Sequence, residues 1–363
     1  MNKDIKISNI QIRALIVSTI IGIGVLGLPN QLAVAMEKDG WIAIILSGLL
    51  TIPVILVINQ IFKDNPGKDF FEIGESNLGK ILFTICLIIY LAYYLAVGAY
   101  ISRVLGEIIK GFLLLETPLG LITFTFIVSI AYLVVSEIDI IARISYMTYG
   151  LTIGFALILI LLAIPGADLT NILPMIQSDI RQLPEGIKVA LFSFAGFEVL
   201  LFAIPFAEDK KRLTKTSISG IVIVIVLYLV LFLVTLTQLS IQQIKSDPFP
   251  LLMVAKLINL PGYFLQNLDG LVTAIWVIII FSTMASVYYS SSKILSKIFR
   301  AKSHKASVLI LIPVIYFLAF LPKNVIQINN IMSNVVIYLA MIVIFLIPFI
   351  LFMVGRIKRR IRQ

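Results

Sequence analysis

One carboxylate, that of Glu198, lies well inside an apolar stretch that is long enough to cross a membrane. Burying this charge in hydrocarbon is costly unless the group is paired, protonated or in contact with water. Glu198 could therefore bind a ligand, act as a gate or carry a coupled proton. Alternatively, it could cap a helix end by accepting hydrogen bonds from free backbone amides. A serine and a glycine interrupt the helix directly before it, in the run Ser193, Phe194, Ala195, Gly196 and Phe197.

The first apolar stretch carries a second interruption, in which three closely spaced glycines weaken the helix and a proline follows them. Pro29 has no N–H to donate and fits best in the first turn of a new helix. The pattern predicts a spanning helix in two halves, although a glycine-rich face packed on a neighbouring helix is the alternative. Bare backbone at mid-membrane is tolerated only where protein or water surrounds it, so the break is a candidate ligand site. Its predicted residues are Gly22, Gly24, Val25, Leu26 and Gly27.

Two broken helices offer complementary partners to a zwitterion. The second half of the first helix presents free amides near Leu26, and the positive end of its dipole, to a carboxylate. The first halves end in free carbonyls, near Ile20 to Gly22 and Phe192 to Phe194, which can accept hydrogen bonds from an ammonium group. An α-amino acid is the natural ligand class. Tyr93 and Tyr100 share a helix face and could close over it, although tyrosines in spanning helices more often pack or lie at the membrane interface.

Hydroxyl groups give the remaining candidate site. Ser282 and Thr283 lie midway along another apolar stretch, where they and unwound carbonyls could hold Na⁺; alternatively, they bond to their own helix or to a neighbour. The single cysteine, Cys86, excludes an internal disulfide, and the single histidine, His304, lies in a basic loop, which excludes a histidine metal site within the membrane. No cofactor beyond H⁺ or Na⁺ is predicted. Because no nucleophile–base pair or metal cluster is visible, we do not expect an enzyme.

Composition defines the class of protein that must position these residues. Hydrophobic residues make up 60% of the 363 residues and charged residues 13%, with a mean hydropathy of +1.06. Soluble proteins of this length need a far more polar surface, so the composition predicts an all-α polytopic membrane protein. The net charge of +10 does not indicate nucleic-acid binding, because the cations concentrate on one predicted side of the membrane.

Ten apolar stretches have spanning length. The interrupted ones are the first and the sixth, which is the pattern of two five-helix repeats of inverted topology with a site at their interface. We therefore expect a single membrane domain over 1–363, with repeats at 10–165 and 186–356 and an external connection at 165–185. The predicted spans are 12–36, 40–61, 81–109, 118–136, 141–164, 186–206, 216–238, 266–292, 306–321 and 333–354.

Lysine and arginine placement predicts the orientation. If the N-terminus is cytoplasmic, 21 of the 29 basic residues fall in cytoplasmic segments, as the positive-inside rule requires. Both termini are therefore expected in the cytoplasm. The basic run at the C-terminus is interpreted as a topology signal rather than as a specific lipid or partner site. Residues 247–260 predict a short helix along the outer interface.

The two interruptions resemble motifs of the amino-acid/polyamine/organocation transporter superfamily. The run from Ile20 to Pro29 is similar to its first-helix glycine motif, and Phe194 to Glu198, followed by Ala207 to Asp209, is similar to its sixth-helix signature. The resemblance implies the LeuT-type fold of that superfamily, with helices one and six broken.

Further pieces occur along nearly the whole chain: Ser8 to Gln11, Asn65 to Lys68, Leu78 to Lys80, Glu116 to Pro118, Ala142 to Ile144, Asn171 to Pro174 and Leu268 to Leu271 with Trp276. Together they resemble the spore-germination permeases, the B-type subunits of nutrient germinant receptors. This resemblance implies sensing of a germinant, often an amino acid, in the spore inner membrane. The implied partners are an A-type membrane subunit and a C-type lipoprotein. The chain differs from many germination permeases at one motif. Its residues 195–198 read Ala-Gly-Phe-Glu, which is closer to general amino-acid transporters, whereas many germination permeases have Phe-Gly-Glu.

Three functions stay open on the sequence. We favour a germinant-sensing subunit that binds a small nutrient between helices one and six. The second is an H⁺- or Na⁺-coupled amino-acid transporter, for which Glu198 and the Ser282-Thr283 pair are the candidate coupling groups. The third is a structural membrane scaffold with a vestigial site.

Overall fold

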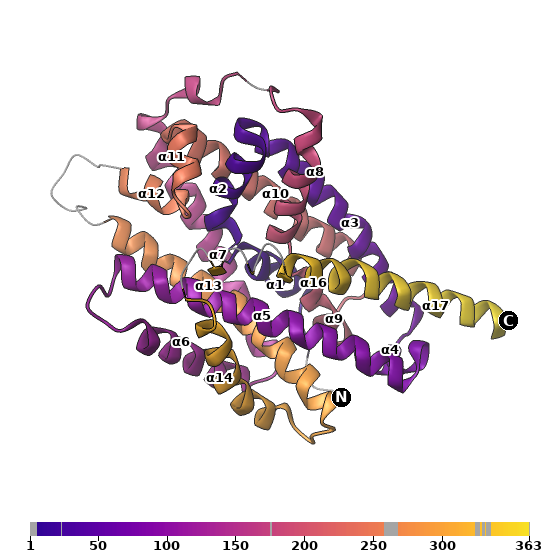
Figure 1. Cartoon of the computed structure of the whole chain (residues 1–363). Coiled ribbons are helices and arrows are strands. Elements are labelled where there is room, and N and C mark those ends of the chain that lie inside the picture. Colours follow the sequence, from indigo (N-terminus) through magenta and orange to yellow (C-terminus); the bar gives the residue numbers. More distant parts are fainter. Residues whose placement is uncertain are drawn as a thin grey trace.

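The computed structural model describes residues 6–22, 24–174, 176–257, 268–323, 327–328, 331 and 335–362. This part of the chain is built from helices, and its one pairing of extended backbone is an isolated parallel bridge between Ile7 and Ala207. Figure 1 shows both termini toward one end of the bundle, together with α4 and the last turns of α13.

The first half of the chain forms one broken helix and four further long helices. Their bounds, with those of the short elements between them, are α1 Asn9–Ile21, α2 Gly24–Met36, η1 Glu37–Asp39, α3 Gly40–Asp64, α4 Phe70–Leu78, α5 Lys80–Phe112, α6 Leu119–Val134 and α7 Ile138–Ala163.

The second half forms a broken helix and four further spans, preceded by three short turns of 3-10 helix. The bounds are η2 Ile164–Gly166, η3 Leu169–Ile172, η4 Ile180–Gln182, α8 Leu183–Ser193, η5 Phe197–Val199, α9 Leu200–Ala203, η6 Ile204–Phe206, α10 Leu213–Gln238, α11 Ile241–Ser246, α12 Pro250–Leu257, α13 Leu268–Ile298, α14 His304–Phe320, α16 Ile337–Met341, η8 Ile342–Leu346 and α17 Ile347–Arg362.

Several of the described helices are long enough to cross a membrane. Six continuous helical stretches are long and apolar enough to cross it, and a bent pair, Ile180–Ser193 with Phe197–Phe206 at 44°, would be a seventh. Three shorter apolar helices are α1, α6 and α14. Each of the ten predicted spans overlaps one or more described helices, although α13 runs six residues past its predicted end at 292 and α17 runs eight residues past 354. The start of the eighth span, 266–267, the start of the tenth span, 333–334, and the end of the predicted interfacial helix, 258–260, lie outside the described residues.

Both predicted helix breaks are present. α1 begins with a capping box, in which Ser8 accepts a hydrogen bond from the amide of Gln11, and it ends at Gly22, whose φ of −28° and ψ of −113° are not helical. The second half starts at Gly24, which makes Pro29 the sixth residue of α2. The prediction that Pro29 lies in the first turn of this helix is therefore wrong. The earlier start buries Val25, Leu26 and the residues that follow them on the same face of α2. In the sixth span, α8 ends at Ser193 and a turn separates it from η5.

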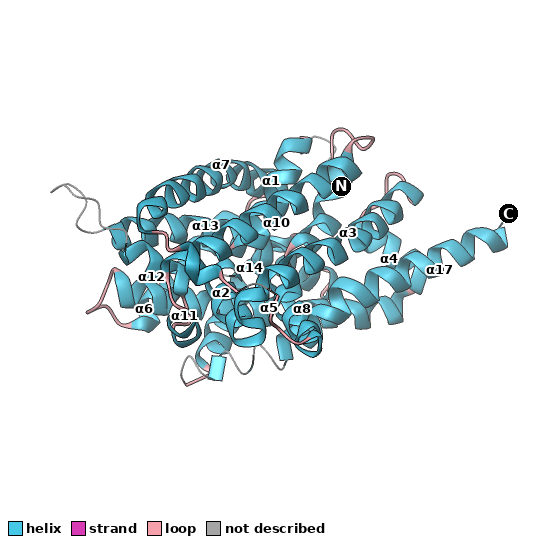
Figure 2. Ribbon diagram, turned by 90° about the horizontal axis from the view of Figure 1, so that it is seen from above, coloured by secondary structure: helices cyan, strands magenta, loops and turns pink. Residues whose placement is uncertain are grey.

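The broken helices occupy the centre of the bundle. α1 is buried without interruption from Ala14 to Ile21, and it packs against α7, α10 and α13. α5 and α13 form the largest helix–helix contact and run side by side (Figure 1). Seen from above, α1 lies beside α7 (Figure 2). A helix that is buried on all faces must satisfy its polar side chains within the protein, which explains why Ser18 and Thr19 are both engaged in the contacts described below.

The connection after α7 covers the end of the bundle opposite to the termini (Figure 1). Asp39 anchors it, because its two carboxylate oxygens accept hydrogen bonds from the backbone amides of Ile176, Gln177 and Ser178 at 2.6, 2.7 and 2.8 Å. The loop that we predicted between the halves is thus tied to the turn between α2 and α3.

Candidate ligand-binding site

The two breaks meet in space. The hydroxyl of Tyr228, on α10, lies 3.1 Å from the carbonyl oxygen of Ile20 and 2.8 Å from that of Ser193, so it reaches the last turns of both α1 and α8. Gly24 is so close to Ser193 that a Cβ atom on this glycine would lie 3.3 Å from the Ser193 carbonyl oxygen. The free carbonyls that we assigned to a ligand ammonium group are therefore partnered by a tyrosine hydroxyl in this conformation.

Glu198 holds the second break together. Its side chain is buried, and its Oε2 accepts a hydrogen bond from the backbone amide of Gly196 at 2.7 Å. The hydroxyl of Tyr93, on α5, donates to Oε1 at 3.0 Å. This is the capping arrangement that the sequence left open as one role of Glu198. The same contacts place the carboxylate at the wall of a cavity, so the capping role and a role toward a ligand are geometrically compatible.

Gly196 is required by the shape of the turn. Its φ is +122°, a conformation that side chains with a Cβ rarely adopt. A Cβ at this position would also lie 2.9 Å from the carbonyl oxygen of Thr19 on α1. The glycine therefore allows the turn of the sixth span to approach the backbone of the first.

A cavity of about 60 Å³ lies between the two breaks, α5 and α13. Nine of the residues predicted for ligand binding, gating or ion binding line it. They are Gly24, Gly27, Tyr93, Tyr100, Ser193, Ala195, Gly196, Glu198 and Thr283.

The other predicted residues do not line the cavity but pack in the protein core. Gly22 packs so closely on Thr283 that a Cβ would lie 2.4 Å from its Oγ1. Phe194 stacks edge-on with Tyr228 at 5.2 Å between ring centroids. Val25, Leu26, Phe197 and Ser282 are buried in the core and are not part of the cavity wall.

Sequence reasoning missed several residues that the tertiary structure brings to this wall. Sequence reasoning also missed Tyr228, which does not line the cavity but bonds to the ends of α1 and α8, and a lone tyrosine in this apolar span is a signal that could have been followed. Gln31, in the outer half of the first span, is another polar residue of this kind. The additional lining residues are Thr19, Ile20, Gln31, Val97, Ile101, Phe192 and Val287.

Hydroxyls from three helices gather next to the first break. Thr283 Oγ1, on α13, donates to the carbonyl oxygen of Ser18 at 2.6 Å. Ser282 Oγ lies 3.1 Å from Ser145 Oγ on α7, and Ser18 Oγ donates to the carbonyl oxygen of Ser145 at 2.9 Å. The bonding to neighbouring helices that the sequence left open as one alternative is thus realised. The same oxygens are hard ligands of the type that Na⁺ prefers, so an ion would replace some of these contacts.

A family model described as "Spore germination protein" matches residues 6–330. The chain belongs to the spore germination protein family. Among other members, spore germination protein A2 of Bacillus subtilis (strain 168) is 28% identical over 358 residues, which are 98% of this chain and 97% of that protein. Spore germination protein YndE of the same organism is 26% identical over 356 residues, 98% of each chain.

Solved structures identify the fold of this spore germination protein. MhsT in complex with L-phenylalanine superposes with a TM-score of 0.67 over 97% of this chain and 99% of MhsT, at 14% identity. A Na⁺-coupled sialic acid symporter in a substrate-bound outward-open state gives 0.65 over 93% and 79%, also at 14% identity. The fold is the LeuT-type transporter fold, with helices one and six broken as the sequence predicted. The family is permease-like rather than enzymatic. Within the described residues, no group of three or more His, Cys, Asp or Glu side chains could hold a metal ion.

Proposed function

We propose that this protein is the permease-like, ligand-binding subunit of a spore germinant receptor, and that it binds a small nutrient, an amino acid, between helices one and six. The single observation that carries the proposal is the cavity at the junction of the two breaks, in a chain of the spore germination family. The proposed site consists of the cavity-lining residues together with Gly22, Val25, Leu26, Phe194 and Phe197 behind them.

The polar groups around the cavity suit an amino acid. The start of α2, at Gly24, presents the positive end of a helix dipole to a carboxylate. An ammonium group would bind the carbonyl oxygens of Ile20 and Ser193, and it would share them with the Tyr228 hydroxyl or displace it. The cavity is small, with a volume of about 60 Å³. The proposal therefore favours a small amino acid over an aromatic one in this conformation.

The receptor role extends beyond the membrane domain. We propose the spore inner membrane as the location, both termini in the cytoplasm, and an A-type membrane subunit and a C-type lipoprotein as partners. Ligand would shift the equilibrium between two conformations of the broken helices, and the partner subunits would respond to the favoured one. We also propose that the repeats run over 10–165 and 186–356, joined by the connection at 165–185.

A thermal-shift panel of amino acids on the purified protein, paired with uptake into liposomes, tests the proposal. We expect stabilisation by one or a few small amino acids without uptake. Gly24→Leu should abolish the stabilisation because the side chain would enter the contact with Ser193 and Tyr228. Gly150→Leu is the matched control, since a Cβ at this exposed helical glycine meets nothing within 4 Å. A normal ligand response in a stably inserted Gly24→Leu variant would refute the site.

A coupled transporter is the second candidate function. The hydroxyl cluster beside the first break favours it, because Ser282, Thr283 and the Ser18 carbonyl supply oxygens of the kind that bind Na⁺. A fold neighbour is described as a Na⁺-coupled symporter. Uptake that requires a Na⁺ or H⁺ gradient would select this function, and Glu198 is the proposed group for H⁺. If no amino acid in the panel is taken up and none stabilises the protein, the result would favour a structural scaffold with a vestigial site.

A further inference from the structure

A basic cavity is lined by α4, the start of α5 and the end of α13, and Figure 1 shows these elements toward the end of the bundle that carries the two termini. Its volume is about 520 Å³. The cations that line it are Lys80, Lys293, Lys297 and Arg300. Glu75 is the one carboxylate that the described chain contributes to this lining. The cavity shares no residue with the proposed nutrient site.

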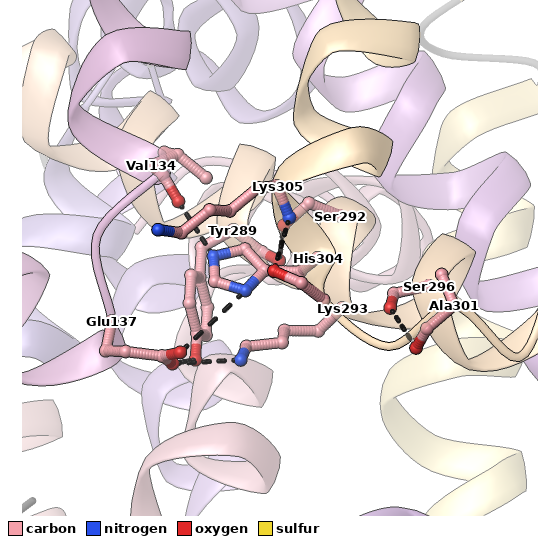
Figure 3. A network of polar contacts seen from close by, with 10 residues as sticks. Val134, Glu137, Tyr289, Ser292, Lys293, Ser296, Ala301, His304 and Lys305 are labelled. Carbon is pink, nitrogen blue, oxygen red and sulfur yellow. Dashed lines mark hydrogen bonds and ion pairs between the residues drawn. The ribbon is translucent and has the colours of Figure 1, made fainter.

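The positive charge in this basic cavity is only partly balanced. Lys297 Nζ lies 3.0 Å from Glu75 Oε1. Lys293 Nζ lies 2.9 Å from Oε2 of Glu137, a residue outside the lining, and Figure 3 shows this pair. In the described chain no carboxylate lies within ion-pair distance of Lys80 or Arg300. Two exposed cations therefore stand at the cavity without a counter-charge.

The start of α5 adds to the same electrostatic field. This helix of 33 residues begins at Lys80, and its N-cap, Gly79, has no side chain that could bond to the first amides. The uncapped start of a long helix carries free N–H groups and a partial positive charge. Lys80 and Thr84, one turn apart, both line the cavity, so this helix end borders it together with the unpaired cations.

We propose that the basic cavity binds a phosphate group, carried by an anionic phospholipid at the membrane surface or by a soluble phosphorylated molecule. Phosphate is the anion that combines hydrogen bonding to a helix start with ion pairs to Lys and Arg. Two unpaired cations match the charge of a phosphate monoester, and one of them balances the phosphodiester of a phospholipid. The space is larger than inorganic phosphate needs, and Phe71 and Leu87 provide an apolar wall for the rest of such a molecule.

The test uses the full chain and two defined probes. Inorganic phosphate is titrated onto protein in neutral detergent, against chloride at equal ionic strength, and binding is followed by calorimetry and thermal unfolding. The lipid arm compares nanodiscs of phosphatidylcholine with nanodiscs that also contain phosphatidylglycerol. The variants are Lys80→Gln, Arg300→Gln and their double variant. Lys302→Gln is the control, because Lys302 is exposed in the same loop but does not line the cavity.

We expect at least one probe to stabilise the native protein. Loss of one charge-assisted contact should weaken its binding by about tenfold, the double variant should abolish it, and Lys302→Gln should change it by less than about twofold. Stabilisation by phosphatidylglycerol alone assigns the site to lipid, and stabilisation by inorganic phosphate assigns it to soluble ligands. The proposal is overturned if neither probe stabilises the protein, or if Lys302→Gln weakens binding as much as Lys80→Gln. Arg300 has a φ of +53°, so Arg300→Gln could change the loop conformation as well as remove a charge. In that case the test depends on Lys80→Gln alone.

Discussion

Single atoms decide how closely the two broken helices approach each other. At Gly196 the absence of a Cβ allows a left-handed turn and a contact with the Thr19 backbone, and at Gly24 it allows contact with Ser193. At Glu198 two carboxylate oxygens each accept one hydrogen bond in a buried environment. Each of these residues acts on backbone that lacks helical hydrogen bonds, so small changes should have large effects on the site.

Gly196→Ala should destabilise the protein by about 1–3 kcal/mol, because a residue held at φ > 0 is strained and the new methyl group meets a backbone oxygen. Thermal unfolding in detergent measures the change. Gly154→Ala is the control, since a Cβ there meets nothing within 4 Å. Equal stability of Gly196→Ala and the control would contradict the assigned geometry of the turn.

Substitutions at Glu198 should separate capping from proton coupling. Glu198→Ala leaves the buried amide of Gly196 without its acceptor, which costs about 1–3 kcal/mol. Glu198→Gln keeps an oxygen acceptor and should retain most of that stability while removing any proton-dependent response. Melting temperatures and ligand-induced shifts of both variants provide the measurement. If Glu198→Gln unfolds as readily as Glu198→Ala, the negative charge itself is required for the cap.

At the scale of elements, polar contacts fix how α13 sits between its neighbours. In mid-span its hydroxyls bond to α1 and α7. Near its end Lys293 pairs with Glu137, the residue before α7, and Tyr289 donates to the same carboxylate oxygen at 3.4 Å. Figure 3 shows His304, the first residue of α14, against this group. α13 is thus linked by polar contacts to the first break and to the ends of α7 and α14.

Thr283→Val should weaken the contact between α13 and α1 by about 1 kcal/mol, because the Ser18 carbonyl loses its hydroxyl donor while the side-chain volume stays similar. If Na⁺ binds here, the wild type should melt at a higher temperature in NaCl than in KCl, and the variant should not. Identical melting of the wild type in both salts would remove the Na⁺ site. Thr125→Val, at an exposed hydroxyl that bonds within its own helix, is the control.

Glu137→Gln should produce a pH-dependent loss of stability. Partial burial raises the pKa of Glu137, but the hydrogen bond and charge of Lys293 outweigh this effect, so the pKa in the folded protein lies below its ordinary value of 4.5. A carboxyl with a lowered folded pKa stabilises the protein above its unfolded pKa and loses that contribution as the pH falls through the folded value. Because the side chain is 42% exposed, we expect about 1 kcal/mol or less. The difference in unfolding free energy between wild type and variant should be constant above pH 5 and vanish in strong acid; a difference that persists there would contradict the ion pair.

At the scale of the whole molecule, the distribution of charge orients the bundle. The basic residues of α17 and of the loop after α13 gather at the end that carries both termini, whereas the connection anchored by Asp39 lies at the other end. The prediction that the basic end faces the cytoplasm depends on the sequence, because the arrangement of helices is the same in either orientation.

Cysteine labelling tests this orientation. In a Cys86→Ala background, Leu169→Cys and Arg360→Cys place single thiols at two exposed positions on opposite ends. A membrane-impermeant maleimide should label Leu169→Cys in intact spheroplasts and Arg360→Cys only after permeabilisation. The reverse pattern would invert the predicted topology.

The sequence by itself determined the class of protein and the positions of the two breaks. These properties depend on local physics: the length of apolar runs, the weakness of glycine in helices and the cost of Glu198 in hydrocarbon. The residues flanking the breaks could be named for the same reason, and Gly24, Gly196 and Glu198 all line the cavity.

Only the tertiary structure decided which groups partner the broken ends. Tyr228 is 208 residues from Ile20 along the chain and yet lies within hydrogen-bond distance of it, and Thr283 reaches Ser18 over a similar separation. Side-chain periodicity cannot predict such pairs, because it identifies a helix face but not the helix packed against it. The same limit applies to Phe194 and Phe197, which we predicted as ligand-binding residues and which do not line the cavity. A residue beside a break can face either side of it, and the neighbouring helices, α10 for Phe194 and α1 for the turn that contains Phe197, determine which side it faces.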